Sequence, residues 1–239
     1  MKVKGWKFVL GVLLGAAVAA FVLKAIPPAL IGLAMLAGLG YGAYVYRRRR
    51  RAEREAVRAS ALGLHRSDGD PFGLVQLPLL LLGRDNTHRM VEDVMFGNWG
   101  ELDVKVFDFR YGPPADEHRY ACALLPTGRS TPAVTLEPRT FFTADDDRGS
   151  LKPVPLKDAA FEEAFDVRGA DAESAEALLI DEVRGWIEEL SIPVGFELNA
   201  DMLLCYAQEG QDPLEVLKAA TGLLHRLPPE PVRAPGDPR

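Results

Sequence analysis

The stretch VEDVMFGNWGELDVKVFDFRY, residues 91–111, carries the clearest strand pattern in the chain. From Leu102 to Val106 apolar and polar residues alternate, which is the period of a strand with one buried face. From Phe107 to Tyr111 the apolar residues occupy the other parity, so we expect a bulge or a strand centre that is buried on both faces. The turn-forming letters GNWG divide the pattern in two, and the stretch therefore predicts a β-hairpin.

Further strand patterns and two helices follow the hairpin. Asp171 can cap a helix whose apolar residues recur every three or four positions as far as Leu190. Another helix is expected to begin at Asp212-Pro213 and to end at Pro228-Pro229. Strands first and helices later, with short connections, indicate an antiparallel sheet rather than a parallel α/β sheet. We expect more strands at 119–125, 133–136 and 164–167, and a strand pair at 194–198 and 202–206 that is joined by a turn at 199–201.

Two apolar stretches, residues 5–23 and 29–46, begin the chain, with the short connector 24–28 between them. At about 1.5 Å per helical residue, each stretch nearly reaches the roughly 30 Å of a bilayer's hydrocarbon core. Lysines precede the first stretch and five consecutive arginines follow the second, whereas the connector has a single lysine. The positive-inside rule therefore predicts a two-span protein of the bacterial inner (plasma) membrane with both termini cytoplasmic.

Aromatic and basic residues at the ends of these stretches are expected at the membrane interface, beside the lipid bilayer. The arginine-rich residues 47–61 favour helix and would extend the second span. Gly11 and Gly15, and likewise Gly38 and Gly42, have the GxxxG spacing that lets helix backbones approach within one chain or between two. The expected interface residues are Trp6, Tyr44, Tyr46, Arg47, Arg48, Arg49, Arg50 and Arg51.

Two other interpretations of the N-terminal region are weaker. A secretory signal with cleavage near residues 17–19 is opposed by the apolar residues that continue to Leu23. A nuclear-localisation or DNA-clamp function for the arginines leaves both apolar stretches unexplained.

The fold class that follows is α+β, with an N-terminal two-helix transmembrane hairpin before a mainly antiparallel β-sheet domain packed with two C-terminal helices. Residues 63–73 are rich in turn formers and predict a linker. Residues 74–83 are apolar, too short to span and hold a proline, which favours a buried edge strand or a segment against the membrane. The expected divisions are a hairpin with its basic end at 1–50, a juxtamembrane helix and linker at 51–70, a cytoplasmic domain at 71–228 and a disordered tail at 229–239.

Charge and cysteine usage exclude several classes of partner. Residues 1–58 hold eleven basic and two acidic side chains, whereas residues 59–239 hold 17 basic and 32 acidic ones. A body this acidic repels phosphate backbones, so we expect no nucleic-acid partner. Cys122 and Cys205 lie in apolar runs without a second cysteine or a histidine at ligand spacing, which predicts buried, reduced thiols and no metal site.

Acidic residues are the strongest catalytic candidates, although none belongs to a recognised motif. Asp108 lies between two phenylalanines, where burial would raise its pKa, but pairing with Arg110 or Arg119 is the simpler alternative. The run 145–147, which is Asp145, Asp146 and Asp147, lacks the glycine and distal glutamate of a calcium loop, so a surface turn is favoured. The histidines are scattered, at His65, His88, His118 and His225. We therefore predict no catalytic, cofactor-binding or metal-binding residues and no cofactor.

The order of several segments resembles a group of uncharacterised bacterial membrane proteins, mostly from actinobacteria. The segments are DPFGLVQLP, then the hairpin, then FEEAFDV with a charged helix, LNADMLLCY and LLHRLPP, which together span residues 70–228. The most specific part is the hairpin pattern G-x-W-x-G/E-x-x-V-x-x-F-D, which begins here at Gly97. The resemblance implies a short membrane anchor before a cytoplasmic α+β domain, and it implies no activity.

These observations favour a non-catalytic, membrane-anchored cytoplasmic interaction module that binds a protein partner or associates with itself through the spans. One alternative is a membrane-associated enzyme that uses Asp108, Glu92 or Asp93 as acid or base. Another is a sensor of anionic lipids in which Arg47–Arg51 bind the headgroups.

Overall fold

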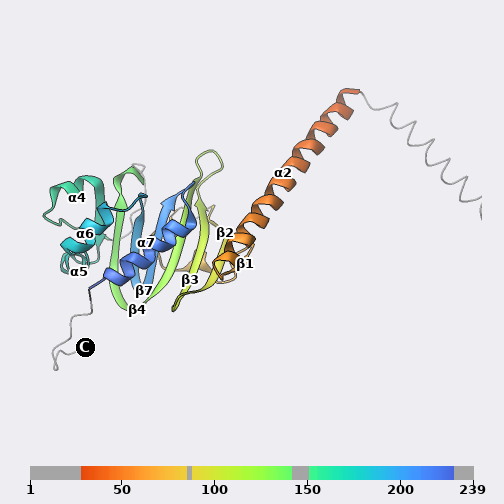
Figure 1. Ribbon diagram of the computed structural model, residues 1–239. Coiled ribbons are helices and arrows are strands. Elements are labelled where there is room, and N and C mark those ends of the chain that lie inside the picture. Colours follow the sequence, from red (N-terminus) through yellow and green to blue (C-terminus); the bar gives the residue numbers. More distant parts are fainter. Residues whose placement is uncertain (1–27, 85–87, 142–150, 229–239) are drawn as a thin grey trace, which may run out of the picture. The chain divides into compact units, whose positions relative to one another are not determined.

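The computed structural model describes residues 28–84, 88–141 and 151–228, which fall into two compact units, Met1–Arg54 and Glu55–Arg239 (Figure 1). The described part of the first unit belongs to helix α2 (Pro28–Ala61), which begins at a proline, as first helical turns tolerate, and runs through the arginine-rich segment without a break. The predicted helical extension to Ala61 is therefore confirmed.

The predicted transmembrane hairpin is wrong for the part of the chain that can be compared. Among the described residues, no helix is both long and apolar enough to cross a membrane. Gly38, Gly40 and Gly42 and three tyrosines lie along the second predicted span, and the same helix then enters the arginine run. The first predicted span, residues 5–23, lies outside the described residues. This finding overturns the two-span topology, the integral-membrane class and the inner-membrane location predicted above.

The second unit is built on a seven-stranded sheet with the strand order β1-β2-β3-β4-β6-β5, in which β7 also pairs with β4. Every pairing is antiparallel, so the α+β class with a mainly antiparallel sheet agrees with the structure. The strands are β1 (His65–Ser67), β2 (Met90–Trp99), β3 (Leu102–Tyr111), β4 (His118–Pro138), β5 (Lys152–Pro153), β6 (Phe165–Gly169) and β7 (Gly195–Gln208).

The hairpin predicted from residues 91–111 is confirmed as β2 and β3, which pair from Met90 with Arg110 to Trp99 with Leu102. The change of side in β3 is real, because Val106 belongs to the core on one face of the sheet and Phe107 to the core on the other. The bulge lies in the partner strand, where the register shifts between Glu92 and Met95.

The long strands β4 and β7 correct the strand predictions for residues 119–136 and 194–206. Each was expected as two strands, but β4 is one strand of 21 residues and β7 one of 14. The turn formers at Gly128 and Ala200, which have positive φ angles of 69° and 54°, lie within the strands where the β4–β7 register shifts. In this ribbon they produce bends and bulges rather than reversals of direction.

The bend of the β4–β7 ribbon brings its two ends together. The Tyr206 ring, near the end of β7, packs on Gly195 at the start of the same strand, where a Cβ atom would lie 2.5 Å from the ring carbon Cε2. Tyr206 also donates a hydrogen bond to Glu137 at the end of β4. Glycine at position 195 is therefore required by close packing rather than by backbone conformation.

Helices cover one face of the sheet, which we call the helix face. The helix α7 (Pro213–Arg226) packs on β4 and β7 and begins as predicted, with Asp212 accepting the Leu214 N–H at 2.8 Å. The single helix expected at 171–190 is instead α5 (Ala172–Leu178), capped by Asp171, and α6 (Asp181–Glu188), preceded by α4 (Ala159–Ala164). Figure 1 shows α4, α5 and α6 grouped beside one end of the sheet.

The opposite face is covered by residues 70–84, which we call the strap, and is named the strap face. The strap contains a 3-10 turn (Leu74–Gln76) and the four-residue helix α3 (Leu80–Gly83). The edge strand predicted for residues 74–83 is therefore wrong, whereas the predicted burial of this segment is confirmed. Asp70 holds its start by accepting the Leu74 N–H at 2.9 Å. The predicted linker at 63–73 likewise contributes β1 to the sheet.

Packing of α6 on α7 gives a matched pair of glycine substitutions. In Gly222→Ala the new Cβ would lie 2.5 Å from Cζ2 of Trp186, so we expect the free energy of unfolding to fall by about 1–3 kcal/mol. In Gly185→Ala nothing lies within 4 Å of the new Cβ. Alanine loses less conformational entropy than glycine when the helix forms, so the free energy of unfolding should rise by about 0.5–1 kcal/mol. Urea denaturation of the full-length protein measures both, and changes of the same sign would contradict the packing.

Candidate functional site

Four side chains from three parts of the chain meet on the strap face, and we call Arg84, Glu137, Glu197 and Tyr206 the polar cluster. Arg84 follows α3 at the end of the strap, Glu137 lies near the end of β4, and the other two lie on β7. All four are buried in the described structure. Because side chains alternate between the faces of a strand, these positions point away from the helix face and under the strap.

Arg84 and Glu137 form the centre of the polar cluster. Nη2 of Arg84 donates to both carboxylate oxygens of Glu137, at 2.7 and 2.8 Å, and the side chains are each 6% exposed. The Tyr206 hydroxyl donates to the same carboxylate. Burial of a charged pair is costly, and it is offset only when the geometry is good and further hydrogen bonds are made. Charge-assisted hydrogen bonds of these lengths meet that condition.

Glu197 joins the sheet to the backbone of the strap. It is 2% exposed, and its carboxylate accepts the N–H of Leu80 and, at 3.1 Å, the N–H of Leu81. Burial raises the pKa of Glu197 to about 7, and the charge of Glu137 acts in the same direction. The two backbone donors and Arg84 lower it, but they do not cancel the effect of burial.

The cavity beside these groups is too small for a substrate. Its volume is about 10 Å³, and its other lining residues include Thr135 and Arg168. That volume accommodates about one water molecule. Nε and Nη1 of Arg84 are buried and have no hydrogen-bond partner among the described residues, so a water in the cavity would find donors there. The polar cluster therefore fits a structural role better than the binding of an organic ligand.

Aromatic rings enclose the cluster on the strap face. The ring of Tyr120 lies 5.8 Å from that of Tyr206, 6.1 Å from that of Tyr111 and 6.2 Å from that of Phe141. Burial raises the pKa of Tyr120 and of Tyr206, so both hydroxyls stay protonated and can act as hydrogen-bond donors at neutral pH.

The acidic catalytic candidates lie elsewhere and do not form a site with the polar cluster. Glu92 accepts a hydrogen bond from Arg110 at 3.0 Å, and Asp93 pairs with Arg66 at 2.5 Å. Asp108 is half-buried and lies opposite Glu92 in the β2–β3 register. None of these three carboxylates lines the cavity described above. The ion pairs of Glu92 and Asp93 with arginines favour a structural role for these two over general acid–base catalysis.

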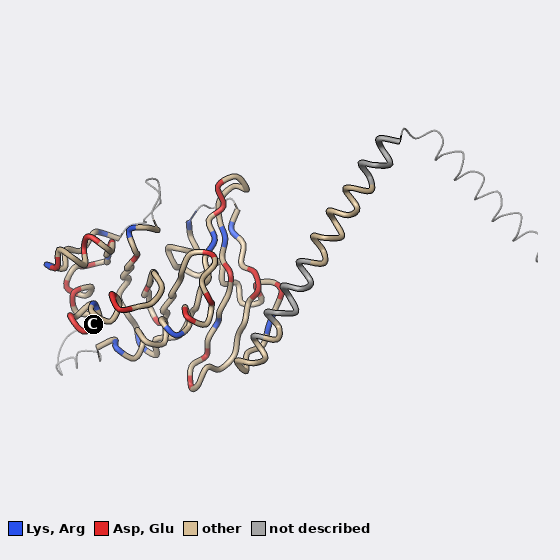
Figure 2. The backbone as a smooth tube through the Cα atoms, turned by 45° about the horizontal axis from the view of Figure 1, so that its top comes forward, with Lys and Arg blue, Asp and Glu red and all other residues tan. Residues whose placement is uncertain are grey.

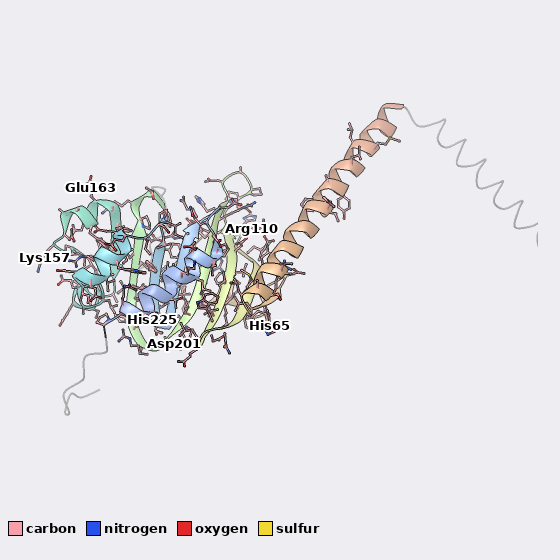
Figure 3. All side chains as sticks on the ribbon, in the orientation of Figure 1. His65, Arg110, Lys157, Glu163, Asp201 and His225 are labelled. Carbon is pink, nitrogen blue, oxygen red and sulfur yellow. The ribbon has the colours of Figure 1, made fainter. Side chains whose placement is uncertain are left out.

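The remaining candidates are scattered or lie outside the described residues. Three of the histidines are exposed, with His65 on β1 and His225 at the end of α7 lying apart in Figure 3, whereas His118 stacks on Tyr111 at 5.0 Å. Cys122 and Cys205 are buried free thiols, as expected. They face opposite sides of the sheet, since Cys122 belongs to the core under the strap and Cys205 to the core under the helices.

The predicted membrane-interface residues are only partly described. Tyr44 and Tyr46 are exposed on α2, at 59% and 57%. Trp6, the run 145–147 and the side chains of Arg47–Arg51 lie outside the described residues, so lipid binding by these arginines stays a prediction. Among the described residues, no group of three or more histidine, cysteine or acidic side chains is arranged to hold a metal ion.

Sequence reasoning missed all four members of the polar cluster. One signal was present, because Glu197 lies between the apolar residues Phe196 and Leu198 in a segment that is predicted as a strand. Its partners lie more than 100 residues away in the strap, and Arg84 is 53 residues from Glu137. Patterns of neighbouring residues cannot indicate contacts between residues that lie so far apart in the sequence.

Removal of Arg84 tests whether the cluster holds the strap. Arg84→Met leaves the Glu137 carboxylate buried without its cation, so we expect a loss of about 3–5 kcal/mol in the free energy of unfolding. Arg84→Met with Glu137→Gln should recover most of this loss, because the uncompensated charge is gone. Arg119→Met, on an arginine that is 41% exposed, should cost less than about 1 kcal/mol. Equal effects of the two single substitutions in urea denaturation would contradict this description.

Comparison with known proteins gives a likeness of fold. No protein-family model and no curated protein matches the chain. The structure is similar to the crystal structure of the mycobacterial trehalose monomycolate transport factor A, TtfA, with a TM-score of 0.55 and 12% sequence identity. The likeness covers 75% of this chain and 97% of that one. At this identity the comparison establishes a shared fold.

Proposed function

We propose that the unit Glu55–Arg239 is a non-catalytic accessory module of a transport process, and that it acts by binding another protein. The observation that carries the proposal is the fold shared with a protein described as a transport factor, over nearly the whole of that chain. We extend the description of that protein to this chain as a hypothesis, since the shared fold alone does not fix an activity.

The chemistry of the described residues supports a binding role over catalysis. The polar cluster encloses a cavity of about 10 Å³, which leaves no room for an organic substrate. The acidic candidates Glu92 and Asp93 are held in ion pairs with arginines. The buried groups with shifted pKa values, Glu197, Tyr120 and Tyr206, lie among packed side chains, whereas active sites direct such groups into a substrate cleft.

The surface of this unit suits a protein partner better than a nucleic acid. Acidic positions outnumber basic ones and are distributed over several elements, as Figure 2 shows. Phosphate backbones are repelled by such a surface. Exposed large apolar residues, which contribute to protein interfaces, are present at Val57, Phe72, Met90 and Ile180.

Site-specific photo-crosslinking in cells of the source organism tests the proposal. A photoreactive amino acid is placed at Phe72, Met90 or Ile180 in separate variants of the full-length protein, and at Lys218 as a polar control. We expect at least one apolar position to capture a defined protein, in an amount that Glu92→Gln and Asp93→Asn leave unchanged. If no position captures a protein above the level of the Lys218 control, the binding role is wrong.

A further inference from the structure

The two ends of the strap are held differently: the start by hydrogen bonds within the strap, and the end by hydrogen bonds to the sheet. At its start, Asp70 of the strap itself accepts the N–H groups of Leu74 and Val75, at 2.9 and 3.1 Å. At its end the acceptor comes from the sheet, because Glu197 of β7 accepts the N–H groups of Leu80 and Leu81. Arg84 bonded to Glu137, and the Asn199 amide bonded to the Pro78 carbonyl, also hold this part of the strap to the sheet. Glu197 therefore supplies one of the contacts that keep the end of the strap on the strap face.

The charges around Glu197 are unevenly matched. Arg84 of the strap faces it but donates its hydrogen bonds to Glu137 of β4. Arg168 of β6 also lines the cavity and is paired with Asp166 at 2.8 Å. Tyr206 of β7 adds a neutral hydroxyl that donates to Glu137. Glu197 therefore shares its surroundings with a second carboxylate while both neighbouring guanidinium groups are bound to other acids.

We propose that Glu197 makes the strap a pH-responsive cover, which lies closed while this carboxyl group is protonated and opens more readily once it ionises. Opening exposes Glu197 to water, which removes the cost of burying its charge beside Glu137. The same movement exposes buried leucines of the strap and the aromatic residues beneath them, which form an apolar surface. The proposal concerns the strap alone and holds whether or not the unit binds a protein.

The direction of the response follows from proton linkage. Burial raises the pKa of Glu197 to about 7 in the closed state, whereas an exposed glutamate titrates near 4.3. Between these values the closed state holds a proton that the open state has lost, so a rise in pH favours opening. The stabilisation of the closed strap is thus present at acid pH, is lost progressively as the pH rises toward 7, and levels off above it. From pH 5.5 to 8 the opening equilibrium should shift by roughly tenfold to thirtyfold.

The two native cysteines supply a probe and its internal control. Cys122 lies in the core under the strap, and Cys205 lies in the core on the helix face. Rates of thiol labelling are measured between pH 5.5 and 8 in the full-length native protein and in the Glu197→Gln variant. For each cysteine, the rate in the native protein is divided by the rate in the Glu197→Gln variant. This ratio cancels the ordinary pH dependence of the reaction between thiol and reagent. For Cys122 we expect this ratio to rise by about tenfold or more, and for Cys205 we expect it to stay constant.

Two results would overturn the proposal. A constant ratio at Cys122 would mean that ionisation of Glu197 does not open the strap, and an equal rise at both cysteines would mean that the whole unit unfolds instead. Glu209→Gln, which removes an exposed carboxylate just beyond β7, serves as the control and should behave like the native protein. If Glu197→Gln fails to fold, hydrogen exchange in the native protein decides, because protection of the Leu80 and Leu81 amides should fall with pH while that of Leu217 in α7 does not. A crosslinked partner could still be found in either case.

Discussion

The structure of the larger unit depends on one buried carboxylate. Glu137 receives hydrogen bonds from Arg84 of the strap and from Tyr206 of β7, so a single charge connects the end of β4, the far end of the curled ribbon and the segment that covers the strap face. Removal of any one partner leaves a charge or a hydroxyl in an apolar core, where it is expensive. This constraint explains why a strongly bent ribbon keeps one conformation instead of relaxing into a flatter sheet.

The same constraint leaves Glu197 without a cation of its own. Because Arg84 is committed to Glu137, the neighbouring glutamate relies on backbone donors from the strap and titrates near neutral pH. Within the polar cluster, Glu137 is thus fixed by its ion pair, whereas Glu197 can change its protonation state near neutral pH. An accessory protein that must expose an apolar surface only under some conditions could use such a division, since the bond from Tyr206 to Glu137 lies within the ribbon while Glu197 responds to pH.

Local sequence patterns predicted the parts of the fold that local interactions determine. The hairpin of β2 and β3, the caps at Asp171 and Asp212 and the burial of residues 74–83 all follow from periodicity and turn chemistry. The turn predicted at residues 199–201 was wrong because a positive φ angle, as at Ala200, can bend a long strand as well as reverse a hairpin. The polar cluster was not predictable, since its partners lie from 53 to 117 residues apart. The membrane hairpin was inferred from composition, and the described part of α2 does not support it.

The curl of the β4–β7 ribbon is the central claim, and a nuclear Overhauser measurement tests it most directly. Gly195 and Tyr206 belong to one strand, and in a straight strand they would lie roughly 35 Å apart. The structure instead packs the Tyr206 ring on Gly195. We therefore predict cross-peaks between the Gly195 Hα protons and the ring protons of Tyr206 in the full-length protein. Their absence, with both residues assigned and folded, would contradict the curled ribbon and the buried cluster that depends on it.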